Sequence, residues 1–454
     1  MPRALPNAPI PSFARAGVVA ALMSAAASAA GQDLRLDVSS RLRYTDDAEG
    51  SDWDATFFSS LAVRDIIRDH LDFKLSGYGL FDLDGDDAFD NALEKTPVRI
   101  SEAYVDLRNL GAIERARLGR QYLFEVDNLR FDGGTIHARL TEALTAFVFG
   151  GRPIAYYESA SGDYYAGAGV IYEPTHRTRH QLDAYIAKEN EATLTATAWR
   201  WNQLWTGNLR TRTRLRFLDS EVRDARIWIS KRFEALGLGL DANLYYQPRT
   251  RGEGEEVAAR TLSSLGAILG PRAAQYRIEA NLSKTFGEHW LAQLGGAIRR
   301  KAGEGEPNTF NSVESDSGHF SITRFNAFVE GLDLTAGAES IHNELDEFWA
   351  VTGSASYSPN RAWRFTAGVT VSEYRFDPID FATTLNGQPD LDILLEELQS
   401  VYYYARARWR PRPTYALFGE VGVDDSDEID GSGLSVRFGF NYHFRRNLGE
   451  EGGA

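Results

Sequence analysis

The feature that most constrains the fold of this chain is a run of alternating residues at 208–217, Asn-Leu-Arg-Thr-Arg-Thr-Arg-Leu-Arg-Phe. Successive side chains of a β-strand point to opposite faces, so the arginines of this run share one face and its leucine, threonine and phenylalanine side chains share the other. The strand therefore has one cationic face and one largely apolar face. A soluble sheet could hold such a strand at its rim, with the arginines in water, so the rest of the chain has to decide where it lies.

The same alternation recurs from Leu34 to Phe444. The segments are about ten residues long, and short turns and longer polar loops follow one another between them, a pattern typical of outer-membrane barrels. In the last segment Leu434, Val436 and Phe438 alternate with polar residues. The pattern predicts an all-β protein, a transmembrane antiparallel β-barrel of about 22 strands, within a range of about 18 to 24.

The free energy of placing arginine in lipid decides which way the arginine face points. An arginine that faces lipid at mid-membrane costs about 2–4 kcal/mol, so the whole run would cost on the order of 10 kcal/mol. That sum is comparable with the stability of a complete domain. We therefore expect the arginines to face the lumen and the apolar column to face lipid, flanked by interfacial aromatic residues.

The ends of the chain predict its location. Residues 1–30 have the pattern of a cleaved signal peptide, with Arg3 and Arg15 before an alanine-rich apolar core and Ala-Ser-Ala at 27–29. We expect the barrel over residues 31–444 and a periplasmic tail over 445–454. Short turns belong on the periplasmic side and long loops, including 45–54 and 82–97, outside. These features predict the outer membrane of a Gram-negative bacterium.

The charge pattern predicts an anion-selective pore. The net charge is −15, but the acids concentrate in the expected external loops and the bases in the expected lumen. A cationic lining between low-dielectric walls concentrates anions, and the planar guanidinium fork suits carboxylate and phosphate. The predicted pore-lining residues are Arg43, Arg120, Arg130, Arg210, Arg212, Arg214, Arg216, Arg226, Arg406, Arg408 and Arg410. The alternative is that these arginines pair with inward carboxylates and only brace a wide lumen.

Other classes of function are less consistent with the sequence. Cysteine is absent, which excludes disulfides and thiolate metal sites, and the eight histidines show no metal-binding spacing. We expect no enzyme, no cofactor and no nucleic-acid partner. Two alternatives stay open, a barrel sheath for a periplasmic electron-transfer cytochrome and an outer-membrane barrel hydrolase. The expected partners are outer-membrane lipid, lipopolysaccharide, the barrel-assembly machinery and the transported anion, and we expect a monomer.

A motif in the first third of the chain resembles a known family. Leu-Gly-Arg-Gln at 118–121, followed by Leu-Arg-Phe-Asp-Gly at 129–133, is similar to the alginate-export outer-membrane barrels. The resemblance implies a monomeric barrel with an arginine-rich lumen through which an anionic polyuronate leaves the periplasm. It transfers two positions, Arg120 and Arg130. The segment 124–128, Phe-Glu-Val-Asp-Asn, departs from the Gly-Asp-rich turn of that family.

Overall fold

A computed structural model of the chain describes residues 33–47, 50–67, 69–82, 98–154, 162–189, 192–250, 273–302, 314–343, 346–376, 397–426 and 433–447. The expected signal peptide lies outside these residues, and so does the expected external loop at 82–97 apart from Asp82, which ends a strand. In the described part of the chain, no helix is long and apolar enough to span a membrane.

Nearly all the described residues belong to β-strands. The first eleven strands are β1 (Asp33–Asp47), β2 (Gly50–Ile67), β3 (Leu71–Asp82), β4 (Val98–Leu110), β5 (Ile113–Leu123), β6 (Leu129–Arg139), β7 (Leu144–Pro153), β8 (Tyr164–Thr175), β9 (Thr178–Glu189), β10 (Ala192–Leu204) and β11 (Leu209–Leu218). The others are β12 (Glu221–Phe233), β13 (Leu238–Gln247), β14 (Gln275–Phe286), β15 (Trp290–Lys301), β16 (Ser315–Arg324), β17 (Leu332–Asn343), β18 (Asp346–Tyr357), β19 (Trp363–Phe376), β20 (Glu397–Arg412), β21 (Tyr415–Ser426) and β22 (Gly433–Asn447). Two 3-10 turns, η1 (Thr206–Asn208) and η2 (Glu234–Leu236), connect neighbouring strands.

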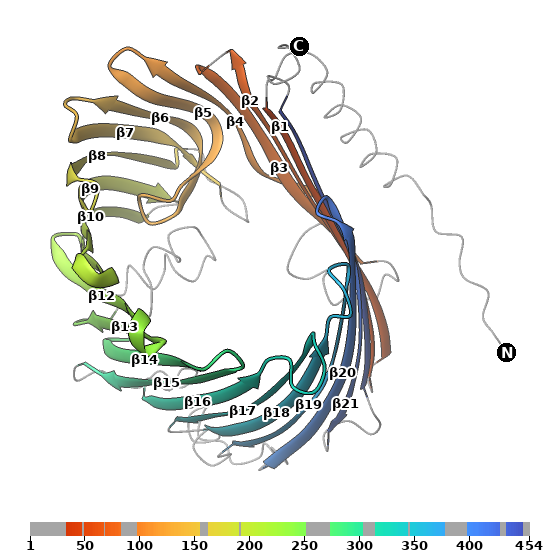
Figure 1. Cartoon of the computed structure of the whole chain (residues 1–454). Helices are drawn as coiled ribbons and strands as arrows, with labels where there is room; N and C mark the ends of the chain where they lie inside the picture. Colours follow the sequence, from red (N-terminus) through yellow and green to blue (C-terminus); the bar gives the residue numbers. More distant parts are fainter. Residues whose placement is uncertain are drawn as a thin grey trace, which may run out of the picture.

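The strands form one closed antiparallel barrel of 22 strands (Figure 1). Each strand pairs with the next along the chain, and β22 closes the ring by pairing with β1, where Asp33 stands opposite Asn447. The predicted fold and strand number are therefore confirmed. Because the number is even, β1 starts and β22 ends at the same end of the barrel. We call this the terminal end and the opposite one the distal end.

Two boundaries differ from those that the sequence predicted. The residues at 45–54, expected as a long external loop, are mostly strand, because β1 runs to Asp47 and β2 begins at Gly50. The pairing of β1 with β2 continues to the hairpin tip, so the acidic residues there extend the two strands. At the other end of the chain β22 runs to Asn447. Residues 445–447, expected in the tail, continue the last strand and pair with β1.

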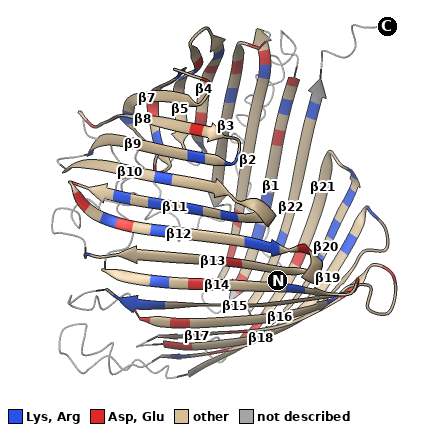
Figure 2. Cartoon of the chain, turned by 60° about the vertical axis from the view of Figure 1, so that its left-hand side comes forward, with Lys and Arg blue, Asp and Glu red and all other residues tan. Residues whose placement is uncertain are grey.

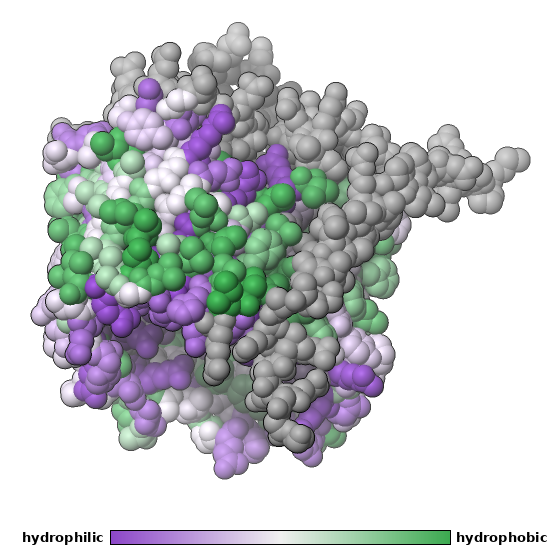
Figure 3. Space-filling model, turned by 90° about the horizontal axis from the view of Figure 1, so that it is seen from above, coloured by the Kyte–Doolittle hydropathy of each residue, from purple (hydrophilic) through white to green (hydrophobic). Residues whose placement is uncertain are grey.

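The outer face of the barrel is apolar. Leu294, Phe320 and Phe438 point outward from three strands and are 55%, 45% and 55% exposed. Side chains of this kind gather in a band across the face shown in Figure 3, with hydrophilic residues on either side of the band. A band of exposed apolar residues between two polar zones is what a lipid-facing barrel surface requires.

Candidate functional site

Basic residues follow one another along β11 and lie beside basic residues of the neighbouring strands (Figure 2). Arg214 and Arg216 contact Asp127 of the β5–β6 turn, which places the arginine face of β11 inside the barrel. Arg214 is the direct register partner of Arg200 on β10 and of Arg226 on β12. Farther round the wall, Arg277 on β14 stands opposite Arg299 on β15. The basic residues therefore form a row across the strands as well as a column along β11.

The hairpin of β5 and β6 bends into the lumen over this wall. Its bend lies where glycine is required, since a Cβ on Gly119 would overlap the carbonyl oxygen of Ala103 and one on Gly133 would overlap that of Gly150. Gly119 also has a φ of +127°, a region that other residues rarely adopt. These close approaches of backbone to backbone let the two strands leave the wall and carry the turn at 124–128 inward.

The turn of this hairpin is held by a buried ionic network. The Asp127 carboxylate lies 3.0 Å from Arg200 and 3.6 Å from Arg216, and it accepts a hydrogen bond of 2.9 Å from the Tyr185 hydroxyl. Burial raises the pKa of Asp127, but Arg216 and Arg200 more than offset it, so the pKa lies below its usual value. The carboxylate is therefore ionised at neutral pH and ties the turn to β9, β10 and β11.

Two further aspartates complete the network. Asp183 on β9 pairs with Arg200, and Asp224 on β12 lies 3.0 Å from Arg214 and 2.5 Å from Arg216. Both carboxylates have side-chain exposures of 0%. Three arginines and three aspartates thus neutralise one another under the hairpin, and a buried charge of this kind requires such pairing.

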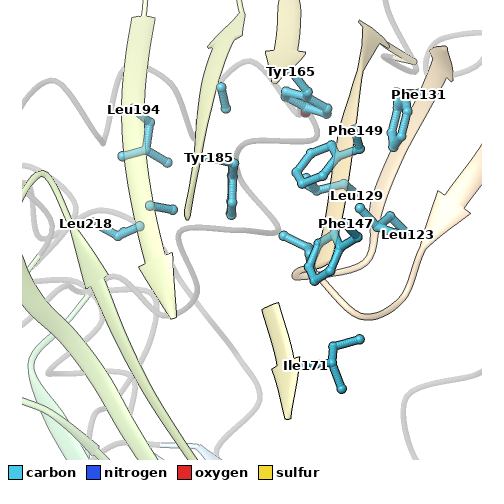
Figure 4. Close-up of a cluster of buried hydrophobic side chains, with 13 residues drawn as sticks. Leu123, Leu129, Phe131, Phe147, Phe149, Tyr165, Ile171, Tyr185, Leu194 and Leu218 are labelled. Atoms are coloured by element: carbon cyan, nitrogen blue, oxygen red, sulfur yellow. The ribbon is translucent and has the colours of Figure 1, made fainter. Parts of the chain in front are cut away.

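A hydrophobic cluster fills the space between the hairpin and the inner wall. Its side chains come from β5 to β11 and gather beneath the turn (Figure 4). Phe131 and Phe149 have ring centroids 5.9 Å apart, and Val126 of the turn is fully buried. The sequence analysis assigned the apolar column to lipid and did not predict an apolar cluster inside the barrel. The inserted hairpin gives the lumen a core of its own in this sector.

The predicted column of arginines divides into two halves. Arg214 and Arg216 belong to the neutral network, whereas Arg210 and Arg212 are exposed and have no acidic partner among the described residues. Arg212 lies 4.9 Å above the Trp228 ring. Both line a cavity of about 600 Å³ at the terminal end. Its charged lining residues are Glu142, Glu173, Arg177, Arg179, Arg210 and Arg212.

A second group of the predicted arginines lies on another part of the wall, on β20 and β1, beside Arg437 of β22. Glu420 binds Arg406 and lies 3.6 Å from Arg437, which stands opposite Arg43 in the register. Arg408 is the register partner of Arg364, and neither has an acidic partner in the part of the chain that the structure describes. Arg410 donates to the carbonyl oxygen of Pro413 at 3.1 Å.

Arg120 and Arg130, the two positions that the family resemblance transfers, lie at the base of the inserted hairpin. Both donate to the carbonyl oxygen of Ile100 on β4, at 3.1 Å and 3.0 Å. Arg120 also forms a two-pronged contact with Asp132, at 2.9 Å and 2.8 Å. These contacts brace the bend, and they separate both residues from the row around Arg214.

Sequence reasoning missed the acids that neutralise half of the arginine column. The inward position of Asp183 could have been inferred from the sequence, because Gln181, Asp183 and Tyr185 alternate with apolar residues along β9. Asp127 gave no such signal, since it lies in a turn whose inward position depends on distant strands. Among the described residues, no group of histidine and acidic side chains could hold a metal ion.

Comparison with known proteins identifies the architecture only. No family model matches the sequence, and no curated protein matches it. The translocation pore of the P pilus usher PapC is 11% identical, with a TM-score of 0.53, over 90% of this chain and 99% of that one. OprD from Pseudomonas aeruginosa is 11% identical with a TM-score of 0.42, over 92% and 94% of the two chains. OccAB2 from Acinetobacter baumannii is 11% identical with a TM-score of 0.43, over 91% and 98%. The similarity to the usher pore shows the fold of an outer-membrane barrel.

Proposed function

We propose that this chain is an outer-membrane channel that passes anionic solutes, with its terminal end in the periplasm. The observation that carries the proposal is the position of Arg210 and Arg212. Both face the lumen beside a cavity at one mouth of the barrel, and neither has an acidic partner among the described residues. A guanidinium group in that position is available to a carboxylate or phosphate of the solute.

The arginines of the neutral network are structural and do not select the solute. Asp127, Asp183 and Asp224 neutralise Arg200, Arg214 and Arg216, so these residues hold the hairpin and add little net field. The channel is therefore narrowed by its own β5–β6 hairpin, and its selectivity comes from the unpaired arginines near the periplasmic mouth. A lumen that contains this hairpin leaves less room for a cytochrome, which disfavours the sheath alternative.

The resemblance to the alginate-export barrels suggests an anionic polysaccharide as the solute. Polymers of this kind carry one carboxylate on each sugar, and the arginines on two parts of the wall, Arg210 with Arg212 and Arg364 with Arg408, offer several places to bind them. Small organic anions fit the same chemistry. The two classes are distinguished by adding each to one side of a single channel and measuring block of the current.

The reversal potential in a planar bilayer with a salt gradient tests the proposal. We expect the wild type to prefer anions and the double variant Arg210→Ala, Arg212→Ala to lose most of that preference, because the field at the mouth is weakened. Arg300→Ala is the matched control, since this arginine pairs with Asp316 at 2.7 Å near the distal end. A wild-type channel that is closed or non-selective would contradict the proposal.

A further inference from the structure

Three cations lie on the outer surface of the barrel at its terminal end. They are Lys231 on β12, Lys284 on β14 and Arg324 on β16. Each is one of the last three residues of its strand. Alternation places them outside, because their register partners are Leu209, Leu238 and Trp290. Cations on the lipid-facing surface are costly at mid-membrane and tolerated near the interface, so these three residues indicate the level of the lipid headgroups at this end of the barrel.

Each of the three cations lies over an aromatic ring at the same end of the barrel. Lys231 is 5.3 Å from the centre of the Phe233 ring, and Lys284 is 5.7 Å from that of Phe286. Arg324 is 5.5 Å from the Trp290 ring. Aromatic side chains beside basic residues are typical of the level at which lipid headgroups meet the hydrocarbon.

The two lysines repeat one local arrangement. Each belongs to a Lys-x-Phe sequence at the end of an even-numbered strand and donates to a carbonyl oxygen of the preceding turn, that of Gly207 for Lys231 and that of Leu236 for Lys284. An ammonium group has three donors, so this contact fixes the group and leaves further N–H bonds for another acceptor. The same contact is therefore formed at two places along this end of the barrel.

The three cations lie in a row along the circumference of the barrel, on alternate strands. Alternate strands lie about 10 Å apart, since neighbouring strands are separated by about 4.8 Å. The apolar residues beside the cations are exposed, with Leu236 and Phe328 at 57% and 77%. The glutamates of the adjoining turns, Glu234, Glu288 and Glu330, lie beyond the strand ends, and Glu234 accepts a hydrogen bond from Asn208.

We propose that this rim, formed by Lys231, Lys284 and Arg324, binds the phosphate groups of anionic phospholipids in the leaflet at the terminal end. The lipid phosphate accepts hydrogen bonds from the cations, and the acyl chains lie against the exposed apolar and aromatic side chains above it. A cation near a membrane surface adds attraction for anionic lipid. The inference rests on the membrane location of the proposed function, and it does not depend on which solute the channel passes.

Native mass spectrometry of the refolded full chain tests the proposal. The protein is equilibrated with equal amounts of phosphatidylglycerol and phosphatidylcholine, and retained lipids are counted. We expect the wild type to retain phosphatidylglycerol preferentially. In the triple variant Lys231→Ala, Lys284→Ala, Arg324→Ala we expect the preference to fall by about fivefold for each cation removed.

The matched control is Arg232→Ala, which removes the cation next to Lys231 on β12 but from the opposite face. It should keep the wild-type preference. If the triple variant does not fold, the single variants Lys231→Ala and Lys284→Ala give the same comparison. Equal retention of both lipids by the wild type, or an equal loss in Arg232→Ala, would overturn the inference. Conductance recorded on the same samples separates this outcome from failure of the channel proposal, since lipid preference without conductance would leave the lipid site standing.

Discussion

Asp127 and Arg216 lie 3.6 Å apart although one belongs to the turn after β5 and the other to β11. In a barrel whose strands pair in chain order, such a contact is formed only if the turn leaves the wall and folds inward over the strands between β6 and β11. The same carboxylate contacts Arg200 on β10 and the hydroxyl of Tyr185 on β9. This one side chain therefore fixes the hairpin to three strands.

We predict that Asp127→Asn releases the hairpin. The variant removes a buried carboxylate from three guanidinium groups, so the turn loses its main attachment and the mean single-channel conductance should rise, with more frequent changes of level. Asp241→Asn is the control, because Asp241 lies on the inner face of β13 away from the network and is exposed. An unchanged conductance in Asp127→Asn would show that the apolar cluster holds the hairpin without the ionic contacts.

A second prediction concerns the bend of the hairpin. A methyl group on Gly133 would overlap the backbone of Gly150, whereas one on Gly134 would meet its nearest neighbour, the Arg117 carbonyl oxygen, at 3.7 Å. We expect Gly133→Ala to cost about 1–3 kcal/mol, as overpacked substitutions do, and Gly134→Ala to stay within about 0.5 kcal/mol of the wild type. Urea unfolding in lipid vesicles measures both. Equal stability of the two variants would mean that the strands separate easily at this point.

The fold was predictable because its signal is local. Alternation of apolar and polar residues over strands such as β11 and β22 is written in consecutive residues, and the free energy of an arginine in lipid then orients each strand. The same rule does not apply where the lumen has its own core. Phe147 and Phe149 on β7 face inward, although an apolar residue on a barrel strand is ordinarily assigned to lipid.

The state of the candidate site could be predicted only in part. The column of arginines was visible along β11, but the difference between Arg212 and Arg216 depends on Asp127 and Asp224, which reach Arg216 through an inserted turn and a shift of register. At that shift, Arg216 pairs with Asp224 while Phe217 pairs with Val222. The alternation of residues along a strand predicts neither the insertion of the turn nor the bulge.

The two halves of the arginine column should respond differently to mutation. Arg216→Ala leaves the buried carboxylate of Asp224 with Arg214 alone, so we expect a loss of stability of about 3 kcal/mol, the lower part of the range for a broken buried pair. Arg210→Ala removes an exposed side chain and should change stability by less than about 0.5 kcal/mol. Unfolding in urea gives both values. Similar values for the two variants would show that the network contributes little.

The face that the column presents can be tested by chemical labelling. The chain contains no cysteine, so Arg212→Cys and Thr213→Cys each introduce a single thiol. A charged, membrane-impermeant maleimide should label the first rapidly, because position 212 faces an aqueous lumen, and the second slowly, because position 213 faces lipid. Faster labelling at position 213 would place the arginines on the outer face and would contradict the proposed channel.

The pH dependence of the hairpin follows from the pKa of Asp127. Burial raises this pKa, but the guanidinium groups of Arg216 and Arg200 lower it by more, so the pKa lies below its usual value. A carboxyl whose pKa is lower in the folded state stabilises that state fully above its unfolded value of about 3.9, and the contribution is lost as the pH falls through the folded pKa. The conductance difference between the wild type and Asp127→Asn should therefore be constant from about pH 8 to about pH 5 and shrink below about pH 4. Loss of that difference already near neutral pH would show that the carboxyl is protonated there, and that the arginines do not hold it in its charged form.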